Sequence, residues 1–219
     1  MGCSHAIYSV RRDVETFVNQ GSTVNLCALD LRKAFDKVNH HGLFNKLMDR
    51  MLPNCLLSLL EYWFSISSTR IRWGGYLSNI ILLKCGVRQG GVLSPHFFAI
   101  YVNDIIKLIQ QSNFGCKIGI INVSIFLYAD DIILLAPSVD ALQRMLILCE
   151  NHLRQLDMAL NAKKSVCLRI GARYKDDCHQ ITTLTGESLC WVDKCRYLGV
   201  VIIAAKRFSI SLTNNKQSF

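Results

Sequence analysis

The sequence predicts an α+β fold in which antiparallel strands are backed by helices. Long segments with apolar residues at helical spacing alternate with short β-rich runs. Glycine or aspartate pairs join neighbouring β-rich runs, as they do in hairpins. The 219 residues are 51% hydrophobic, so the chain can bury a sizeable core, and this composition argues against disorder.

Five segments have the apolar periodicity of helices. The first ends at Gly21 and the second at Pro53, both residues that stop helices. Ser94 as N-cap and Pro95 at the first helical position open the fourth. The expected helices are residues 4–20, 39–52, 55–66, 94–111 and 140–160.

The remaining apolar runs have the length and composition of strands. Gly74-Gly75 joins two β-rich runs and predicts a hairpin. Residues 125–136 are strand-like on both sides of Asp130-Asp131, which predicts a second hairpin with acids at its tip. The other expected strands are residues 23–29, 166–170, 187–192 and 197–203.

Three aspartates lie at the ends of apolar strands: Asp30, Asp130 and Asp131. A carboxylate at the end of a buried strand is costly unless something compensates its charge, and adjacent carboxylates repel each other. Bound Mg²⁺ resolves both problems, and two such ions catalyse in-line phosphoryl displacement. The alternative is that each aspartate serves only as a turn residue.

Five blocks, in order along the chain, resemble the palm motifs of reverse transcriptases encoded by non-LTR (LINE-type, jockey-like) retrotransposons. The resemblance covers nearly the whole chain. The blocks are Ala28-Leu29-Asp30-Leu31-Arg32-Lys33-Ala34-Phe35-Asp36-Lys37-Val38, Gly86-Val87-Arg88-Gln89-Gly90-Gly91-Val92-Leu93-Ser94-Pro95, Phe126-Leu127-Tyr128-Ala129-Asp130-Asp131, Asn161-Ala162-Lys163-Lys164-Ser165 and Tyr197-Leu198-Gly199-Val200.

The resemblance implies a right-hand polymerase palm with partial fingers and no complete thumb. It implies that Asp30 and Asp130 are the main ligands of two Mg²⁺ ions, with Asp131 beside them and Mn²⁺ as a substitute, and that Leu31 lends its backbone carbonyl. Lys164 matches the lysine that protonates departing pyrophosphate, although its neighbour Lys163 is an alternative.

The resemblance also implies contacts to nucleotide and primer. Phe35 matches a steric gate against the ribonucleotide 2′-OH, although a core aromatic residue at a helix start is an alternative. Gln89 and Gly90 match positions that contact the nascent base pair, and the stretch Tyr197-Leu198-Gly199 matches the primer grip. Asp36 is interpreted as a helix-start residue and not as a metal ligand.

The implied function is that of an RNA-directed DNA polymerase, a nucleotidyltransferase that joins dNTPs to a DNA primer 3′-OH on an RNA template. A catalytically inactive retroelement remnant that only binds nucleic acid is the alternative. Template-independent nucleotidyl transfer is a third possibility, and the pairing of Arg88-Gln89-Gly90 with Tyr128-Ala129-Asp130-Asp131 argues against it.

We expect residues 1–205 to form the palm with partial fingers and residues 206–219 to begin a thumb connection, in a chain truncated at both ends relative to the family. A core without complete fingers and thumb is expected to bind nucleic acid weakly and to polymerise poorly on its own. We also expect apolar residues such as Ile202-Ile203-Ala204 to be exposed in it.

The formal net charge of +9 favours a polyanionic partner, and on charge alone this is nucleic acid or an anionic membrane. No apolar run is long enough to span a membrane and no secretory signal is present, so we expect an intracellular protein, nuclear or cytoplasmic, without membrane contact. The ten cysteines include no CxxC pair and fit no common zinc pattern. The sequence does not indicate an oligomeric state.

Overall fold

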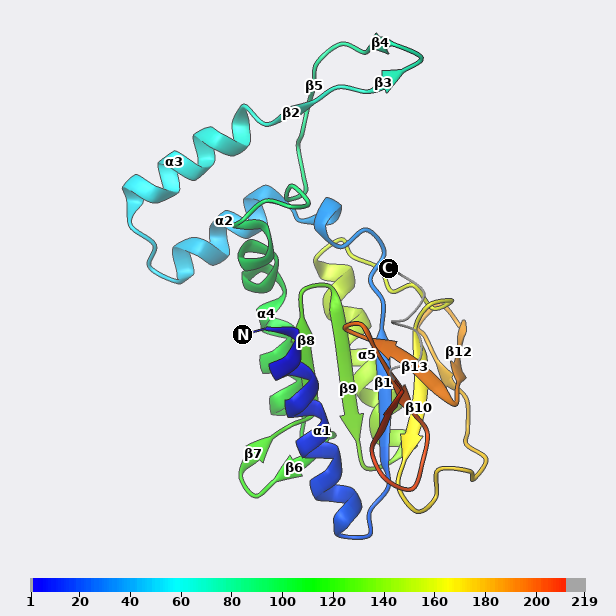
Figure 1. Ribbon diagram of the computed structural model, residues 1–219. Helices are drawn as coiled ribbons and strands as arrows, with labels where there is room; N and C mark the ends of the chain where they lie inside the picture. Colours follow the sequence, from blue (N-terminus) through cyan, green and yellow to red (C-terminus); the bar gives the residue numbers. More distant parts are fainter. Residues whose placement is uncertain (1, 212–219) are drawn as a thin grey trace. The chain divides into compact units, whose positions relative to one another are not determined.

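The computed structural model describes residues 2–211 (Figure 1). Within this range the chain divides into two compact units. One unit contains residues 2–32 together with 104–211, and the other is Lys33–Asn103. The division of the sequence into residues 1–205 and 206–219 stays a prediction, and residues 212–219 lie outside the described part of the chain.

A six-stranded sheet with the order β11-β12-β10-β1-β9-β8 forms the centre of the first unit (Figure 1). Strand β1 lies between β9 and β10 and is antiparallel to both, whereas β12 runs parallel to β10. The strands are β1 (Val24–Leu29), β8 (Ile125–Tyr128), β9 (Asp131–Ala136), β10 (Val166–Ile170), β11 (Ile181–Thr182) and β12 (Ser188–Trp191). This unit also carries a short hairpin, β6 (Lys117–Ile118) with β7 (Ile121–Asn122).

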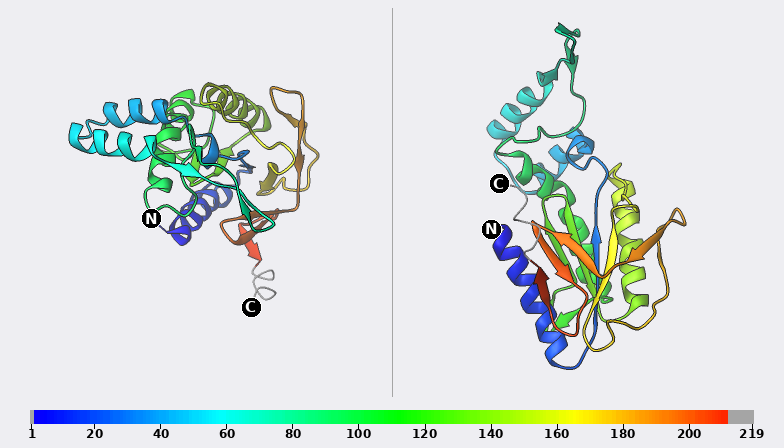
Figure 2. Two further views of the ribbon diagram at one scale, coloured as in Figure 1. Left: turned by 90° about the horizontal axis from the view of Figure 1, so that it is seen from above. Right: turned by 45° about the vertical axis from the view of Figure 1, so that its right-hand side comes forward.

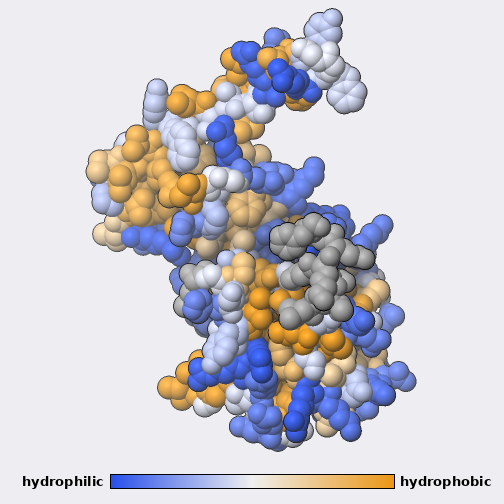
Figure 3. Space-filling model, in the orientation of Figure 1, coloured by the Kyte–Doolittle hydropathy of each residue, from blue (hydrophilic) through white to orange (hydrophobic). Residues whose placement is uncertain are grey.

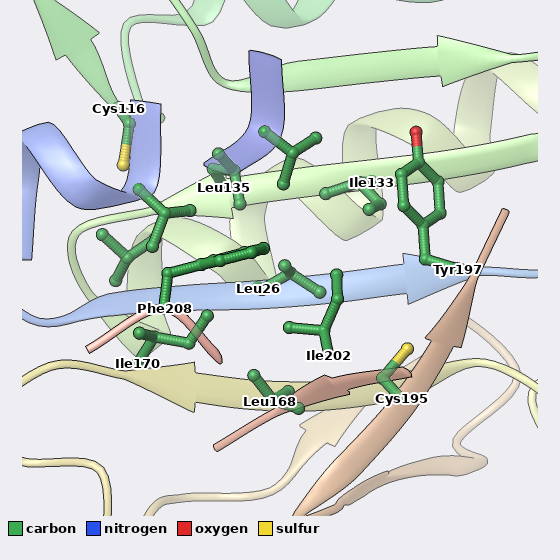
Figure 4. Close-up of a cluster of buried hydrophobic side chains, with 13 residues drawn as sticks. Leu26, Cys116, Ile133, Leu135, Leu168, Ile170, Cys195, Tyr197, Ile202 and Phe208 are labelled. Carbon is green, nitrogen blue, oxygen red and sulfur yellow. The ribbon is translucent and has the colours of Figure 1, made fainter. Parts of the chain in front are cut away.

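Alternate residues of the central strands form a buried apolar cluster on one face of this sheet (Figure 4). Leu26 of β1, Ile133 of β9 and Leu168 of β10 belong to it. Helix α1 (Cys3–Asn19) contributes Val10 and Val14 to the same cluster, as the helical spacing of its apolar residues predicts.

Helix α5 (Val139–Gln155) packs against β1 and β9, on the side of the sheet opposite α1 (Figure 2). The Ser138 side chain caps it by accepting a hydrogen bond from the Ala141 backbone N–H at 3.1 Å. The predicted helix to residue 160 is too long. The chain turns at Asp157, where φ is +56°, because Leu160 pairs with Leu31 in an antiparallel bridge beside the end of β1.

A second sheet of three antiparallel strands completes this unit: β13 (Lys194–Tyr197), β14 (Val200–Ile203) and β15 (Ser209–Ser211). The predicted single strand over 197–203 is wrong. Leu198 and Gly199 form a tight turn between two strands, with φ of +46° and +83°. The predicted exposure of Ile202 is also wrong, because its side chain is fully buried in the apolar cluster, and Ile203 and Ala204 are half-buried.

The second unit is built from short helices and two small strand pairs. Strand β2 pairs with β5, and β3 pairs with β4 around Gly74-Gly75, which confirms the predicted hairpin. The elements are a 3₁₀ turn at Phe35–Lys37, α2 (His40–Asp49), α3 (Asn54–Ser65), β2 (Ser68–Thr69), β3 (Arg72–Trp73), β4 (Tyr76–Leu77) and β5 (Ile81–Leu82).

Helix α4 (Ser94–Ser112) begins in the second unit and ends in the first, and its last residue lies one position beyond the predicted end. Ser94 is its first helical residue, and the Ser94 hydroxyl donates a hydrogen bond of 2.5 Å to the carbonyl of Arg88. A capping side chain accepts a hydrogen bond from the helix. Ser94 therefore ties the preceding loop to the helix instead of acting as the predicted N-cap.

Candidate active site

The strand register brings the three predicted acids to one end of the central sheet. Leu29 pairs with Ile132, so continuing the antiparallel register by one residue places Asp30 beside Asp131. On the other side of β9, Tyr128 pairs with Asp131 and closes the turn that contains Asp130. One carboxylate thus follows β1, and two lie where β8 turns into β9.

The turn that carries Asp130 has an unusual backbone. Ala129 adopts φ +51°, the left-handed region that residues with a Cβ rarely enter. Such conformations cost free energy and occur often at functional sites. The Asp130 side chain is exposed, whereas Asp30 and Asp131 are half-buried, so the acids range from the sheet edge to solvent.

The three carboxylates interact electrostatically. Burial, followed by the negative charges of Asp130 and Asp30, raises the pKa of the Asp131 carboxyl above its usual range. Across residues 2–211 no three His, Cys, Asp or Glu side chains converge into a preformed metal cluster. Mg²⁺ is usually held by one or two carboxylates together with substrate phosphates, so these residues fit a divalent ion that arrives with its nucleotide.

The segment Asn161–Ser165 holds Asp30 in place through three hydrogen bonds. The Asn161 side-chain amide donates to Oδ2 of Asp30 at 2.9 Å, and the Asn161 backbone N–H donates to the Asp30 carbonyl at 2.8 Å. The buried Ser165 hydroxyl accepts from the Asp30 backbone N–H at 3.0 Å. The sequence places both residues in the fourth motif but assigns neither this role.

The other predicted residues near Asp30 are placed as follows. Leu31 is buried and forms the bridge to Leu160. Lys163 and Lys164 both have exposed side chains, and the Lys164 backbone N–H donates to the Asn161 carbonyl at 3.0 Å. The choice between the two lysines as proton donor stays open.

Tyr197 reaches toward the acids from the second sheet. Its ring belongs to the buried cluster, with the hydroxyl directed away from the other labelled side chains (Figure 4). Burial, followed by the negative charge of Asp131, raises the pKa of the Tyr197 hydroxyl. This hydroxyl is buried and makes no hydrogen bond within residues 2–211. The neighbouring Leu198 and Gly199 form the turn described above.

The hydroxyl of Tyr128 also lies in this region. The Cys3 thiol at the start of α1 donates a hydrogen bond to it at 3.3 Å. The sequence gives no signal for this contact, because it joins residues far apart in the chain.

The predicted nucleotide-binding residues belong to the second unit. Phe35 is half-buried and stacks on the fully buried Phe98, with ring centroids 5.0 Å apart and an interplanar angle of 19°. The ring therefore has the packing that the core-aromatic alternative requires, and the role as a steric gate stays a prediction. Gln89 and Gly90 are exposed, and Gly90 adopts φ +80° in a loop that favours glycine.

Paired carboxylates at the ends of antiparallel strands suit metal-assisted phosphoryl transfer, the chemistry of nucleotidyl polymerases. The chain belongs to the family described as "Reverse transcriptase (RNA-dependent DNA polymerase)", whose model matches residues 3–202.

Curated relatives place the chain among the reverse transcriptases of mobile elements. It is 33% identical over 155 residues to a Pol polyprotein of the R2 retrotransposable element from Popillia japonica, which covers 70% of this chain and 22% of the relative. It is 29% identical over 203 residues to the RNA-directed DNA polymerase of the mobile element jockey from Drosophila funebris, and this alignment covers 88% of this chain and 21% of the relative. The chain thus spans about a fifth of the length of these relatives, and the LINE-type resemblance is confirmed.

Solved structures of telomerase have a similar fold. Apo telomerase from Candida tropicalis, truncated from its C-terminal domain, aligns with TM-score 0.64 over 95% of this chain and 39% of its own, at 14% identity. Telomerase from Candida albicans in complex with a telomeric RNA fragment aligns with TM-score 0.66 over 96% and 35%, also at 14% identity. The α+β polymerase fold predicted from sequence is confirmed.

Proposed function

We propose that this chain is the catalytic core of an RNA-directed DNA polymerase from a non-LTR retrotransposon. The observation that carries the proposal is the group of acids at one sheet edge, in a chain of the reverse transcriptase family. Asp30 is fixed by Asn161 and Ser165, and Asp131 interacts with both other carboxylates.

Each acid has a role that follows from its position. Asp30 and Asp131 would hold a divalent ion from two neighbouring strands, and Asp130 would do so from the exposed turn. The bound Mg²⁺ ions would lower the pKa of the primer 3′-OH and stabilise the charge on the phosphoryl oxygens. Burial and then the charges of Asp130 and Asp30 raise the pKa of Asp131, and this supports the assignment, because a bound cation would offset both effects.

The remaining residues of the proposal bind substrate or supply a proton. The side chain of Lys164 is exposed, and it would supply a proton to departing pyrophosphate. Phe35, Gln89 and Gly90 would contact the incoming dNTP, and Tyr197, Leu198 and Gly199 the primer. The partners are an RNA template and a DNA primer, which the net charge of +9 supports. Ten free cysteines suit a reducing compartment, the nucleus or cytoplasm.

Template-dependent primer extension tests this function. Extension of oligo(dT) on poly(rA) is compared with oligo(dT) alone, beside a binding assay on the same nucleic acids. The chain is used as it stands and joined to the flanking segments of a jockey relative. Extension only with the RNA template supports the proposal, and extension without it indicates template-independent transfer. Binding without extension in both forms indicates an inactive remnant.

A further inference from the structure

The hairpin β3–β4 of the second unit presents two aromatic rings to solvent. Trp73 and Tyr76 pair across the Gly74-Gly75 turn, and their side chains are 84% and 83% exposed. Directly opposite residues of an antiparallel pair lie on the same face. Neither ring contacts another aromatic ring or a cation within residues 2–211.

The backbone of the hairpin has a defined shape. Gly74 and Gly75 adopt φ of +50° and +88°, as a two-residue turn with two left-handed positions requires. Beyond the paired residues, the Ser78 backbone N–H donates to the Ile71 carbonyl at 2.9 Å, and the Ile71 N–H donates to the Ser78 hydroxyl at 3.0 Å. The rings therefore project from a hydrogen-bonded ladder.

The charge around the hairpin is of one sign. From Tyr62 to Asn103 the sequence contains no Asp or Glu, whereas it contains two arginines on the hairpin, Arg70 and Arg72, followed by Lys84 and Arg88. None of these four cations forms an ion pair within residues 2–211. In the space-filling view, hydrophilic, intermediate and hydrophobic side chains are mixed at the hairpin, and hydrophobic ones gather over α3 (Figure 3).

We propose that the hairpin β3–β4 binds an unpaired nucleic-acid strand, whose bases stack on Trp73 and Tyr76 while Arg70 and Arg72 neutralise its phosphates. Exposed aromatic rings beside unpaired cations are the combination with which proteins hold single strands without reading sequence. A protein partner would meet four like charges with no acid among them. The proposal deepens the proposed function, since it gives the single-stranded template a binding surface.

Stacking and charge neutralisation have different salt dependences, and this difference allows a sharp test. The loss of one phosphate contact lowers the slope of log affinity against log salt, whereas the loss of a stacked ring lowers affinity at every salt concentration. Arg72→Ala is therefore expected to reduce the slope. Trp73→Leu, which keeps apolar area but removes the ring, is expected to reduce affinity with the slope unchanged.

The experiment measures fluorescence anisotropy of a labelled, mixed-sequence 12-nucleotide RNA, of DNA with the same sequence, and of the RNA–DNA duplex. Trp73→Leu and Tyr76→Ala should each weaken single-strand binding at least about fivefold. Trp73→Phe should retain most of it. Tyr62→Ala, which removes a tyrosine of α3 that is 64% exposed, is the matched control and should bind like the unaltered chain.

The RNA and DNA arms show which single strand is preferred, and the proposal requires both to bind more tightly than the duplex. Unchanged single-strand affinity in Trp73→Leu and Tyr76→Ala would overturn it, as would failure of the unaltered chain to bind single strands. A change of oligomeric state in these variants without a change in RNA binding would overturn it in favour of a protein contact. Primer extension tests the proposed function separately, because the binding assay contains no dNTP and requires none of the three acids.

Discussion

Removal of the Asn161 side chain should weaken divalent-cation binding at the acids. The Asn161 amide donates 2.9 Å from Oδ2 of Asp30 and fixes the direction in which this carboxylate points. A hydrogen bond to a charged group contributes about 1.5–3 kcal/mol. Since Asp30 is half-exposed, the lower value applies, and about 1.5 kcal/mol corresponds to about a tenfold loss of affinity.

The assay is a titration with Mn²⁺ followed by electron paramagnetic resonance, which counts bound ions without requiring turnover. Asn161→Ala keeps the backbone hydrogen bonds of the segment, so the fold is retained and only the carboxylate is released. Lys163→Ala is the control, because its exposed side chain belongs to the same segment. Equal Mn²⁺ affinity in Asn161→Ala and the unaltered chain would refute the reasoning.

Three further predictions concern selectivity, folding and thiol chemistry. In a form of the protein that extends primers, Phe35→Val should raise rNTP incorporation relative to dNTP by about tenfold, because the 2′-OH no longer meets an aromatic ring. An unchanged ratio of rNTP to dNTP incorporation would show that Phe35 is not a steric gate. Gly171→Ala should lower the melting temperature by about 5–10 °C, because Gly171 adopts φ +131° and the added Cβ would lie 2.7 Å from the Ser22 carbonyl oxygen and from the Thr23 Cα. The Cβ of Gly21→Ala meets no atom, so this control should lower the melting temperature less, and equal losses in a thermal melt would contradict the prediction. Burial raises the pKa of the Cys149 thiol to about 12, so about one molecule in 10⁴ is thiolate at pH 8, and mass spectrometry should find iodoacetamide on the exposed Cys55 long before Cys149; comparable labelling would be inconsistent with the buried site.

The motifs and most elements could be predicted from the sequence because their signals are local. The hairpin at Gly74-Gly75 and the acid-tipped hairpin over 125–136 both form as predicted, since turn residues between β-rich runs specify them. The end of helix α5 could not be predicted. Its apolar spacing continues to Leu160, but the bridge from Leu160 to Leu31 overrides that periodicity.

Tertiary contacts explain the rest of what the sequence leaves undetermined. Leu198-Gly199 interrupts an apolar run that has the composition of one strand, and the turn appears only because β14 folds back on β13. The three acids could be predicted by type and position. The role of Asn161 in orienting Asp30 could not be predicted, because its side chain reaches Asp30 from a segment more than 100 residues away in the chain.

Mg²⁺-dependent primer extension by matched acid variants tests the central claim most directly. The chain, joined to the flanking segments of a jockey relative, is assayed on poly(rA)/oligo(dT) with Asp130→Asn and with Asp36→Asn, an exposed acid of the first motif that we do not assign to the metal. We predict that Asp130→Asn lowers dNTP incorporation at least about 100-fold, whereas Asp36→Asn retains most of it. Incorporation that persists in Asp130→Asn, or falls equally in both variants, would contradict the account.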